Sequence, residues 1–392
     1  MKNKNDIIDE KIADIFEKLV SIDSPSLKER KMADHLKTLF GEIGIELEED
    51  QTQEKTGSDA GNLFARLEGE ADAEPLLLGV HMDTVDPARN KKAVFHPDGT
   101  VTSDGTTVLG ADDLAGITAV YEAVCFLKRN RISHRPVEIL ITTGEELYCK
   151  GANAFDYSKI RSKEAYVLDL SGKIGTAAYA APTLVSFSAK IQGKAAHAGF
   201  SPEKGINSIA IAAKGIARLS QGRIDETTTA NIGTFCGGTG TNIVPEECVL
   251  KGEIRSLNHE KAMKILREYH EIFLEETNKG GGRLEWEEKL NIVAYETPLG
   301  GKTVQNYKKA VEKLDLVPKF EKTFGGSDNN VFALHGIEGL VIATSMNQVH
   351  SCQEYTSIPE IRQVAQIVVN LCMIKGRINR GQEECKVNLC TA

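Results

Sequence analysis

The sequence has no apolar run that approaches the roughly 20 residues of a membrane span. Its first segment, MKNKNDIIDEKIADIF, lacks the continuous apolar core of a secretion signal and has the spacing of an amphipathic helix. Hydrophobic residues make up 41% of the chain, as is typical of a globular protein with a buried core. We therefore expect a cytoplasmic protein without a membrane partner.

No C-x-x-C pair is present, although the chain contains eight cysteines. They are scattered at Cys125, Cys149, Cys236, Cys248, Cys352, Cys372, Cys385 and Cys390. In a cytoplasmic chain of this length, such spacing favours reduced thiols that fill the core over a disulfide framework. The same spacing argues against a zinc site built from thiolates.

A basic stripe is also absent. Lysine and arginine number 47 against 56 aspartates and glutamates, which gives a net charge of -9 at pH 7. An acidic protein repels phosphate backbones, so we expect no nucleic acid partner. The carboxylate excess suits a protein that holds divalent cations, but taken alone it more often serves solubility.

The chain of 392 residues is longer than a domain with a single hydrophobic core usually is, and its predicted secondary-structure pattern changes twice. Up to residue 181, strand-like runs such as PLLLGVH and VEILITTG alternate with amphipathic helices. Residues 182–296 contain alternating strands and two helices, and the earlier pattern returns in 297–392. The sequence predicts an α/β domain with a central mixed sheet flanked by helices, formed by 1–181 and 297–392 and interrupted by an α+β domain at 182–296.

Near the N-terminus, two helices are expected before the first strand. The first is the amphipathic segment already noted. The second should run from about Ser26 to Gly41, with Ser26 as its cap and Gly44 just past its end.

Side chains that can bind metals or transfer protons follow the ends of the predicted strands. In chain order they are His81 and Asp83 in HMD, Asp112 and Asp113 in LGADDLAG, Glu145 and Glu146 in ITTGEELY, Asp169 in VLDLSG and His350 in SMNQVHSC. The carboxyl ends of parallel strands meet at one edge of an α/β sheet, where ligands bind. We therefore expect these side chains to lie close together.

Each of these residues also has an explanation that involves no function. A histidine after a strand is more often a hydrogen-bonded structural residue, Asp112 or Asp113 could cap the following helix, and paired glutamates often lie in a solvated turn. Their joint occurrence changes this assessment. So many carboxylates, without a lysine or arginine in the same turns, are strongly unfavourable unless cations balance them.

Two divalent ions would balance this charge. Imidazole and carboxylate ligands without thiolates suit zinc, with manganese or cobalt as alternatives. Two ions roughly 3.5–4 Å apart need a bridging carboxylate, and they lower the pKa of a trapped water towards about 7, which gives a bridging hydroxide. A further carboxylate has to take the proton of the water. Either of the adjacent Glu145 and Glu146 can do so while the other binds metal.

The ordered set of H-x-D, G-A-D-D-x-A-G, T-G-E-E, a strand-end aspartate and a late histidine resembles the dinuclear zinc aminoacylase/carboxypeptidase G family of metallopeptidases. Within that family, the chain is most similar to the peptidase T-like aminotripeptidases. The resemblance covers nearly the whole chain, and it implies a zinc-peptidase-like catalytic domain with an inserted α+β lid domain of the dimerisation type. A homodimer through the lid is therefore possible.

The resemblance implies a role for each strand-end residue. His81 and Asp169 would hold one zinc, Glu146 and His350 would hold the other, and Asp112 would bridge the two ions. Glu145 would be the general base and later the acid, and Asp83 would orient His81 by a hydrogen bond to its other nitrogen. In the family, the peptide that follows the bridging aspartate is cis.

The inserted domain contributes further candidates through the same resemblance. His197 in KAAHAGF matches a lid histidine that polarises the scissile carbonyl, although it could equally be an exposed histidine at a strand end. Arg255 in GEIRSLN matches an arginine that grips a substrate carboxylate, although most strand arginines are simply solvated. Asn242 in TNIVP and the loop GGSDNN match segments near the substrate site.

The function implied is the hydrolysis of amide bonds in short peptides by an aminopeptidase. An N-acyl amino acid deacylase or a carboxypeptidase on the same two metals remains the nearest alternative, because each cleaves an amide. A non-catalytic binding protein is disfavoured by the complete set of proposed ligands together with Glu145. A phosphoesterase is disfavoured because the sequence lacks a basic or glycine-rich phosphate cradle.

Overall fold

The computed structural model describes residues 4–70 and 73–373. The chain divides into two compact units, which are described separately. The described residues of unit 1 fall within 1–179, 296–322 and 327–392, and those of unit 2 are 180–295 and 323–326. Cys385 and Cys390 lie outside the described residues. The remaining six cysteines are free thiols, as the sequence predicts.

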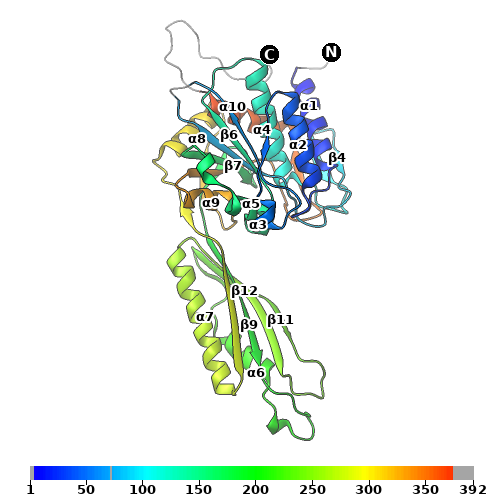
Figure 1. Ribbon diagram of the computed structural model, residues 1–392, viewed down its shortest axis with the longest axis vertical. Coiled ribbons are helices and arrows are strands. Elements are labelled where there is room, and N and C mark those ends of the chain that lie inside the picture. The colour runs from blue at the N-terminus through cyan, green and yellow to red at the C-terminus, as the bar shows by residue number, and fades with distance from the viewer. Residues whose placement is uncertain (1–3, 71–72, 374–392) are drawn as a thin grey trace. The chain divides into compact units, whose positions relative to one another are not determined.

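Unit 1 is built on a nine-stranded mixed sheet (Figure 1) with the order β1-β2-β6-β3-β7-β16-β8-β14, in which β15 also pairs with β8. The strands are β1 (Glu48–Glu49), β2 (Leu63–Leu67), β3 (Leu76–His81), β6 (Val137–Thr142), β7 (Glu164–Leu170), β8 (Thr176–Ala181), β14 (Tyr295–Glu296), β15 (Lys319–Lys322) and β16 (Glu338–Ala343). Strand β3 runs parallel to β6 and β7, and β7 runs parallel to β16. The carboxyl ends of these strands therefore share one edge of the sheet.

Helices pack on both faces of this sheet. They are α1 (Lys4–Val20), α2 (Arg30–Glu42), α3 (Gln53–Thr56), α4 (Ala111–Arg129), α5 (Lys150–Ala154), α8 (Lys302–Glu312), α9 (Asp328–Leu334) and α10 (Ile358–Cys372), with the short 3₁₀ helices η1 (Glu145–Leu147) and η2 (Tyr157–Lys159). The fold class expected from the sequence, a mixed sheet flanked by helices, is confirmed.

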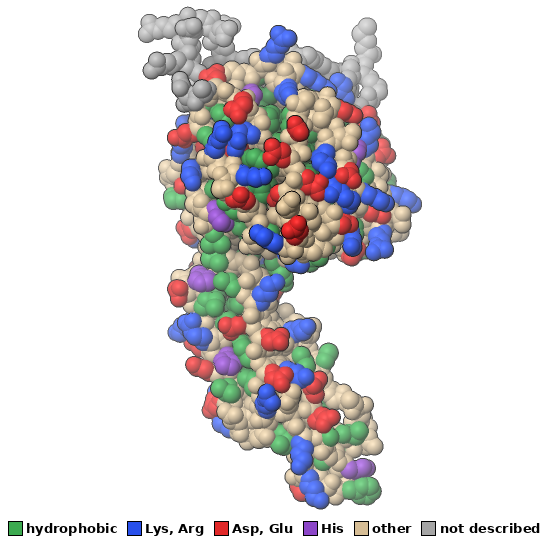
Figure 2. All heavy atoms as spheres, viewed as in Figure 1, with side chains coloured by type: hydrophobic (Ala, Val, Ile, Leu, Met, Phe, Trp, Pro, Cys, Tyr) green, Lys and Arg blue, Asp and Glu red, His purple; other side chains and the backbone are tan. Residues whose placement is uncertain are grey.

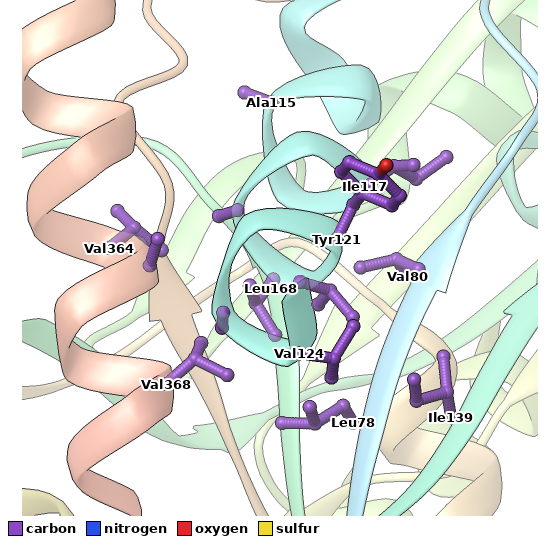
Figure 3. Packing of buried hydrophobic residues seen from close by; sticks show 14 of the residues in the cluster. Leu78, Val80, Ala115, Ile117, Tyr121, Val124, Ile139, Leu168, Val364 and Val368 are labelled. Carbon is purple, nitrogen blue, oxygen red and sulfur yellow. The ribbon is translucent and has the colours of Figure 1, made fainter. Parts of the chain in front are cut away.

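The main core lies between the sheet and helices α4 and α10. Figure 3 shows Leu78 and Val80 of β3 and Leu168 of β7 pointing at α4, which presents Tyr121 and Val124. These side chains are at most 4% exposed. Burying each large apolar side chain stabilises the fold by about 1.5–3 kcal/mol. The strand that ends at His81 is therefore held firmly along its length.

On the opposite face, Gly79 of β3 allows helix α9 to approach the sheet. A Cβ atom at this position would lie 2.9 Å from the ring of Phe332, closer than packed carbon atoms tolerate. The glycine therefore fixes where α9 sits, and with it Asp328 at the start of that helix.

The helix expected over 26–41 begins later than predicted. Helix α2 starts at Arg30, after Glu29. Pro25 accepts a hydrogen bond from the N–H of Lys28 in a turn, and Leu27 has a φ of 69°, which no helix accommodates. Ser26 is therefore not a cap. Its hydroxyl donates to Oδ2 of Asp83 at 2.7 Å.

A small three-stranded antiparallel sheet, which the sequence analysis missed, has the order β17-β5-β4. Its strands are β4 (Ala93–Phe95), β5 (Thr100–Ser103) and β17 (Tyr355–Ser357). They are too short for periodicity to reveal them. The pairing of β17 with β5 carries the segment after His350 back towards the loop before α4.

Unit 2 is an α+β domain with a five-stranded antiparallel sheet of order β10-β11-β12-β9-β13. Its elements are β9 (Thr183–Gln192), η3 (Pro202–Lys204), α6 (Ser208–Arg218), β10 (Gly222–Asp225), β11 (Thr228–Gly237), β12 (Glu247–Ser256), α7 (His259–Gly280) and β13 (Arg283–Ile292). Alternate β9 residues such as Phe187 and Ile191 are buried in a core that includes residues of α6 and α7. This alternation is the pattern that identified the domain in the sequence.

None of the helices formed by the described residues is long and apolar enough to cross a membrane. Acidic and basic side chains are interspersed over the face of the protein that Figure 2 shows. That view contains no continuous basic stripe.

Candidate metal centre

The two carboxylate oxygens of Asp112 face different histidines. Oδ1 lies 3.1 Å from Nε2 of His81, and Oδ2 lies 3.3 Å from Nε2 of His350. Asp169 Oδ1 lies 3.9 Å from the same nitrogen of His81, and Glu146 Oε2 lies 3.1 Å from the same nitrogen of His350. The structure thus forms two groups of donor atoms that share the carboxylate of Asp112.

The strand ends position these donors. His81 is the last residue of β3, and Asp169 is the penultimate residue of β7. Glu146 follows β6 after a short turn, and His350 follows β16. Because these strands are parallel, segments that are far apart in the sequence end side by side.

The loop that carries Asp112 is shaped by Gly110, whose φ of 79° is rare for residues with a side chain. The peptide between Asp112 and Asp113 is cis, and both residues depart from helical geometry although they lie in the first turn of α4. The carboxylate of Asp113 accepts hydrogen bonds from the backbone N–H groups of His81 and Gly116.

Asp83 holds the turn that presents the paired glutamates. Its Oδ1 accepts from the N–H of Glu145 at 2.9 Å, and its Oδ2 accepts from the N–H of Glu146 at 3.3 Å. The Nδ1 atom of His81 is closer to the backbone oxygen of Asp83, at 2.9 Å, than to its carboxylate, at 3.5 Å. Asp83 therefore orients His81 through its backbone oxygen, while its carboxylate positions Glu145 and Glu146.

Burial dominates the electrostatics of the carboxylates around Asp112. It raises the pKa of Asp169, and the neighbouring Asp112 and Glu145 raise it further. Burial also raises the pKa of Glu145 and of Glu146. Asp112 differs: despite its burial, the imidazoles of His350 and His81 lower its pKa. Burial thus disfavours the charged forms of Asp169, Glu145 and Glu146, and cations bound beside them would favour those forms.

The donor set fits divalent cations. The carboxylates of Asp112, Glu146 and Asp169 form ion pairs with His81 and His350, and within residues 4–70 and 73–373 no lysine or arginine forms an ion pair with them. Oε1 of Glu146 is buried and has no hydrogen-bond partner. An orphaned carboxylate oxygen among imidazoles and carboxylates is the environment that zinc and similar ions occupy.

The three candidates from the inserted domain lie in unit 2. His197 is exposed, stacks on Phe200 with ring centroids 4.2 Å apart, and bridges through its backbone to Ile243, next to Asn242. Asn242 is also exposed, and its carbonyl accepts from the N–H of Ala198. These two candidates are therefore neighbours on one surface of that unit.

Arg255 is not free in the structure. Its Nε donates to Glu253 at 2.8 Å, and its Nη1 donates to the carbonyl oxygen of Phe324 at 2.9 Å. The alternation of strand residues places Glu253 and Arg255 on the same face of β12, so the sequence already implied that they could pair.

Several residues around the centre escaped the sequence analysis. Glu354 is 1% exposed, and its carboxylate accepts hydrogen bonds from the N–H groups of Gly110 and Asp112. Glu29 is fully buried and accepts from the N–H of Gly144, just before the paired glutamates. Each is a single acidic residue in an irregular or helical segment, so no spacing pattern distinguishes it from a surface glutamate.

Comparison with known proteins gives two family matches. The peptidase dimerisation domain matches residues 179–281, and peptidase family M28 matches residues 62–199. Among curated proteins, the uncharacterized protein YqjE of Bacillus subtilis is 41% identical over 361 residues, which cover 92% of this chain and 97% of that protein.

Two solved structures resemble most of the chain. The aminopeptidase PepT of Bacillus cereus is 39% identical with a TM-score of 0.87, and the match covers 93% of this chain and 98% of that one. A tripeptidase of Staphylococcus aureus is 33% identical with a TM-score of 0.90, and the match covers 93% and 97% of the two chains.

Proposed function

The chain belongs to the peptidase T-like branch of the M20 metallopeptidase family, and from this premise we propose that it is a two-zinc aminopeptidase that acts on short peptides such as tripeptides. The observation that carries the proposal is the carboxylate of Asp112, whose two oxygens face His81 and His350. A carboxylate that faces two imidazoles in this way is placed to serve two ions.

The metals would be held by residues of unit 1 alone. His81 and Asp169 would bind one ion, Glu146 and His350 the other, and Asp112 both. When bound, such ions polarise a carbonyl and activate water at neutral pH. Zinc is the ion we propose, because imidazole and carboxylate donors suit it, and manganese or cobalt would fit the same donors.

Glu145 is the proposed proton carrier. Its side chain is 8% exposed, and its backbone is fixed by the carboxylate of Asp83. Burial raises its pKa and nearby carboxylates raise it further, which makes its carboxylate a better proton acceptor than a solvated one. It would take a proton from the attacking water and return it to the departing amine.

The residues of unit 2 are proposed to bind the substrate. His197 would donate to the oxygen of the scissile carbonyl, and Arg255 would hold the carboxylate of the peptide, with Asn242 nearby. Since Arg255 already bonds to Glu253, a substrate carboxylate would have to compete with that residue. The match of this region to a peptidase dimerisation domain supports a homodimer as the working form.

A substrate comparison tests the proposal. The protein loaded with zinc should hydrolyse free tripeptides faster than N-blocked peptides or N-acetyl amino acids. A preference for the blocked compounds would replace the aminopeptidase with a deacylase or carboxypeptidase acting through the same groups. Metal analysis of the same preparation tests for two ions per chain.

A further inference from the structure

A second group of donor atoms lies in unit 1 beside the candidate metal centre and contains none of its proposed ligands. It consists of Glu145, Cys149 and Asp328, whose donor atoms all lie within 4.8 Å of one another. Their exposed fractions are 8%, 1% and 1%. We refer to these three residues as the thiol cluster.

Three separate segments build the thiol cluster. Glu145 is the first residue of η1, Cys149 precedes α5 with a φ of 54°, and Asp328 begins α9. The Sγ atom of Cys149 lies 3.4 Å from Oε1 of Glu145. The thiol is therefore aimed at the proposed proton carrier, not at the solvent.

Asp328 supplies the observation that indicates a ligand. The hydroxyl of Thr142 donates to its Oδ2 at 2.5 Å. Its Oδ1 is buried and has no hydrogen-bond partner, although a carboxylate oxygen without one is costly at this depth. A cation bound by Asp328, the Cys149 thiol and Glu145 would offset this cost.

The spacing suits a tetrahedral ion such as zinc. Bonds of about 2.3 Å to sulfur and 2.0 Å to oxygen place the two donor atoms about 3.5 Å apart at a tetrahedral angle. The observed separation of Sγ and Oε1 is 3.4 Å. Cadmium, which is softer, would use the same thiolate and carboxylates.

We propose that the thiol cluster is an inhibitory cation site, which binds zinc or cadmium after the catalytic ions are in place. The inhibition rests on the proposed function, because it acts through Glu145. A cation on Oε1 of Glu145 occupies the lone pair that would accept the proton of water, so turnover falls while substrate still binds. The proton of the Cys149 thiol passes to solvent when the metal–sulfur bond forms.

The site should bind more weakly than the catalytic centre. The thiol cluster offers three donors, and the Cys149 thiol has to lose its proton before its sulfur can bind a cation. Inhibition is expected only when zinc exceeds the amount that fills the catalytic ions.

A zinc titration of peptide hydrolysis tests the inhibition. In the natural protein, kcat should fall as free zinc rises, with little change in KM. Cys149→Ser should keep the basal turnover and require more than about tenfold higher zinc for the same loss, since one ligand is missing. Cys352→Ser, a half-buried thiol outside the cluster, is the matched control and should behave as the natural protein.

Cadmium binding tests the site without relying on activity. Added to the zinc-loaded protein, cadmium should produce thiolate charge-transfer absorption in the ultraviolet. The part of the absorption that comes from the Cys149 thiolate should be present in Cys352→Ser and absent in Cys149→Ser. Asp328→Asn keeps an acceptor for Thr142 and should weaken the same part, so it provides an independent variant if Cys149→Ser misfolds.

The possible outcomes separate the two proposals. Equal zinc inhibition of the natural protein and Cys149→Ser, or cadmium absorption that does not depend on Cys149, would overturn the inhibitory site while leaving the peptidase intact. If the protein shows the Cys149-dependent absorption but hydrolyses no peptide, the cation site stands and the proposed function is refuted.

Discussion

Glu354 accepts a hydrogen bond from the backbone N–H of Asp112 at 2.9 Å, although 242 residues separate them in the chain. Its other oxygen accepts from the N–H of Gly110 at 2.7 Å. The backbone of Asp112, the proposed bridging residue, is therefore held by a side chain that follows His350 by four residues. One short segment positions both Asp112 and His350.

Replacing Glu354 should lower the metal affinity of the candidate centre, although Glu354 is not one of the proposed metal ligands. Glu354→Ala leaves the two backbone N–H groups unsatisfied, which costs about 1–3 kcal/mol of unfolding free energy for each group that water does not reach. Metal affinity should fall by about 10–100-fold, as for other residues that orient a ligand. Zinc titration and denaturant unfolding measure the two effects. Glu312→Ala, on an exposed helix surface, should change neither.

Glu145→Gln separates proton transfer from metal binding. The amide cannot accept the proton of water, so turnover should fall on the order of 10²–10⁴-fold. The backbone N–H of residue 145 still bonds to Asp83, and the proposed metal ligands are unchanged, so zinc content should remain that of the natural protein. Steady-state kinetics and metal analysis provide the test, and an active variant would refute the role.

Substitution of Asp112 should weaken the binding of more ions than substitution of Asp169. Asp112→Asn affects both donor groups, whereas Asp169→Asn affects only the group with His81. We expect binding of both ions to weaken in the first variant and of one ion in the second. Isothermal titration with zinc distinguishes them. Identical stoichiometry and affinity in both variants would contradict a bridging role for Asp112.

Gly79→Ala tests how α9 is held against the sheet. Its Cβ would lie 2.9 Å from the ring of Phe332, and relieving such overpacking usually costs about 1–3 kcal/mol. The free energy of unfolding should fall by that amount in urea. Gly41→Ala is the matched control, because nothing lies within 4 Å of its Cβ inside α2, and it should be neutral or stabilising by about 0.5–1 kcal/mol.

The sequence revealed much of the site because of how the strands are built. His81, Asp169 and the glutamate pair each follow a mainly apolar strand segment, and such segments form parallel strands whose ends meet at one edge. The prediction that they lie together needed no knowledge of loop conformations. The roles of these residues in metal binding and catalysis remain predictions.

Other contacts depend on chain geometry that periodicity does not encode. Ser26 looked like a helix cap, but the turn at Pro25 and Leu27 aims it at Asp83. Glu354 reaches the site through a short strand pairing without a strong sequence pattern, so it is recognised only once the tertiary structure is known. Asp328 lies in the loop GGSDNN, which the sequence already matched to a segment near the substrate site, but its contact with Thr142 depends on where the short helix α9 lies.

The order of the donors along the chain has a consequence for biosynthesis. His81, Asp112, Glu146 and Asp169 all precede the whole of unit 2, whereas His350 and Glu354 come after it. A nascent chain in which His350 has not yet been synthesised contains only part of the proposed ligand set. The complete set of proposed metal ligands is therefore available only after unit 2 and His350 have been synthesised.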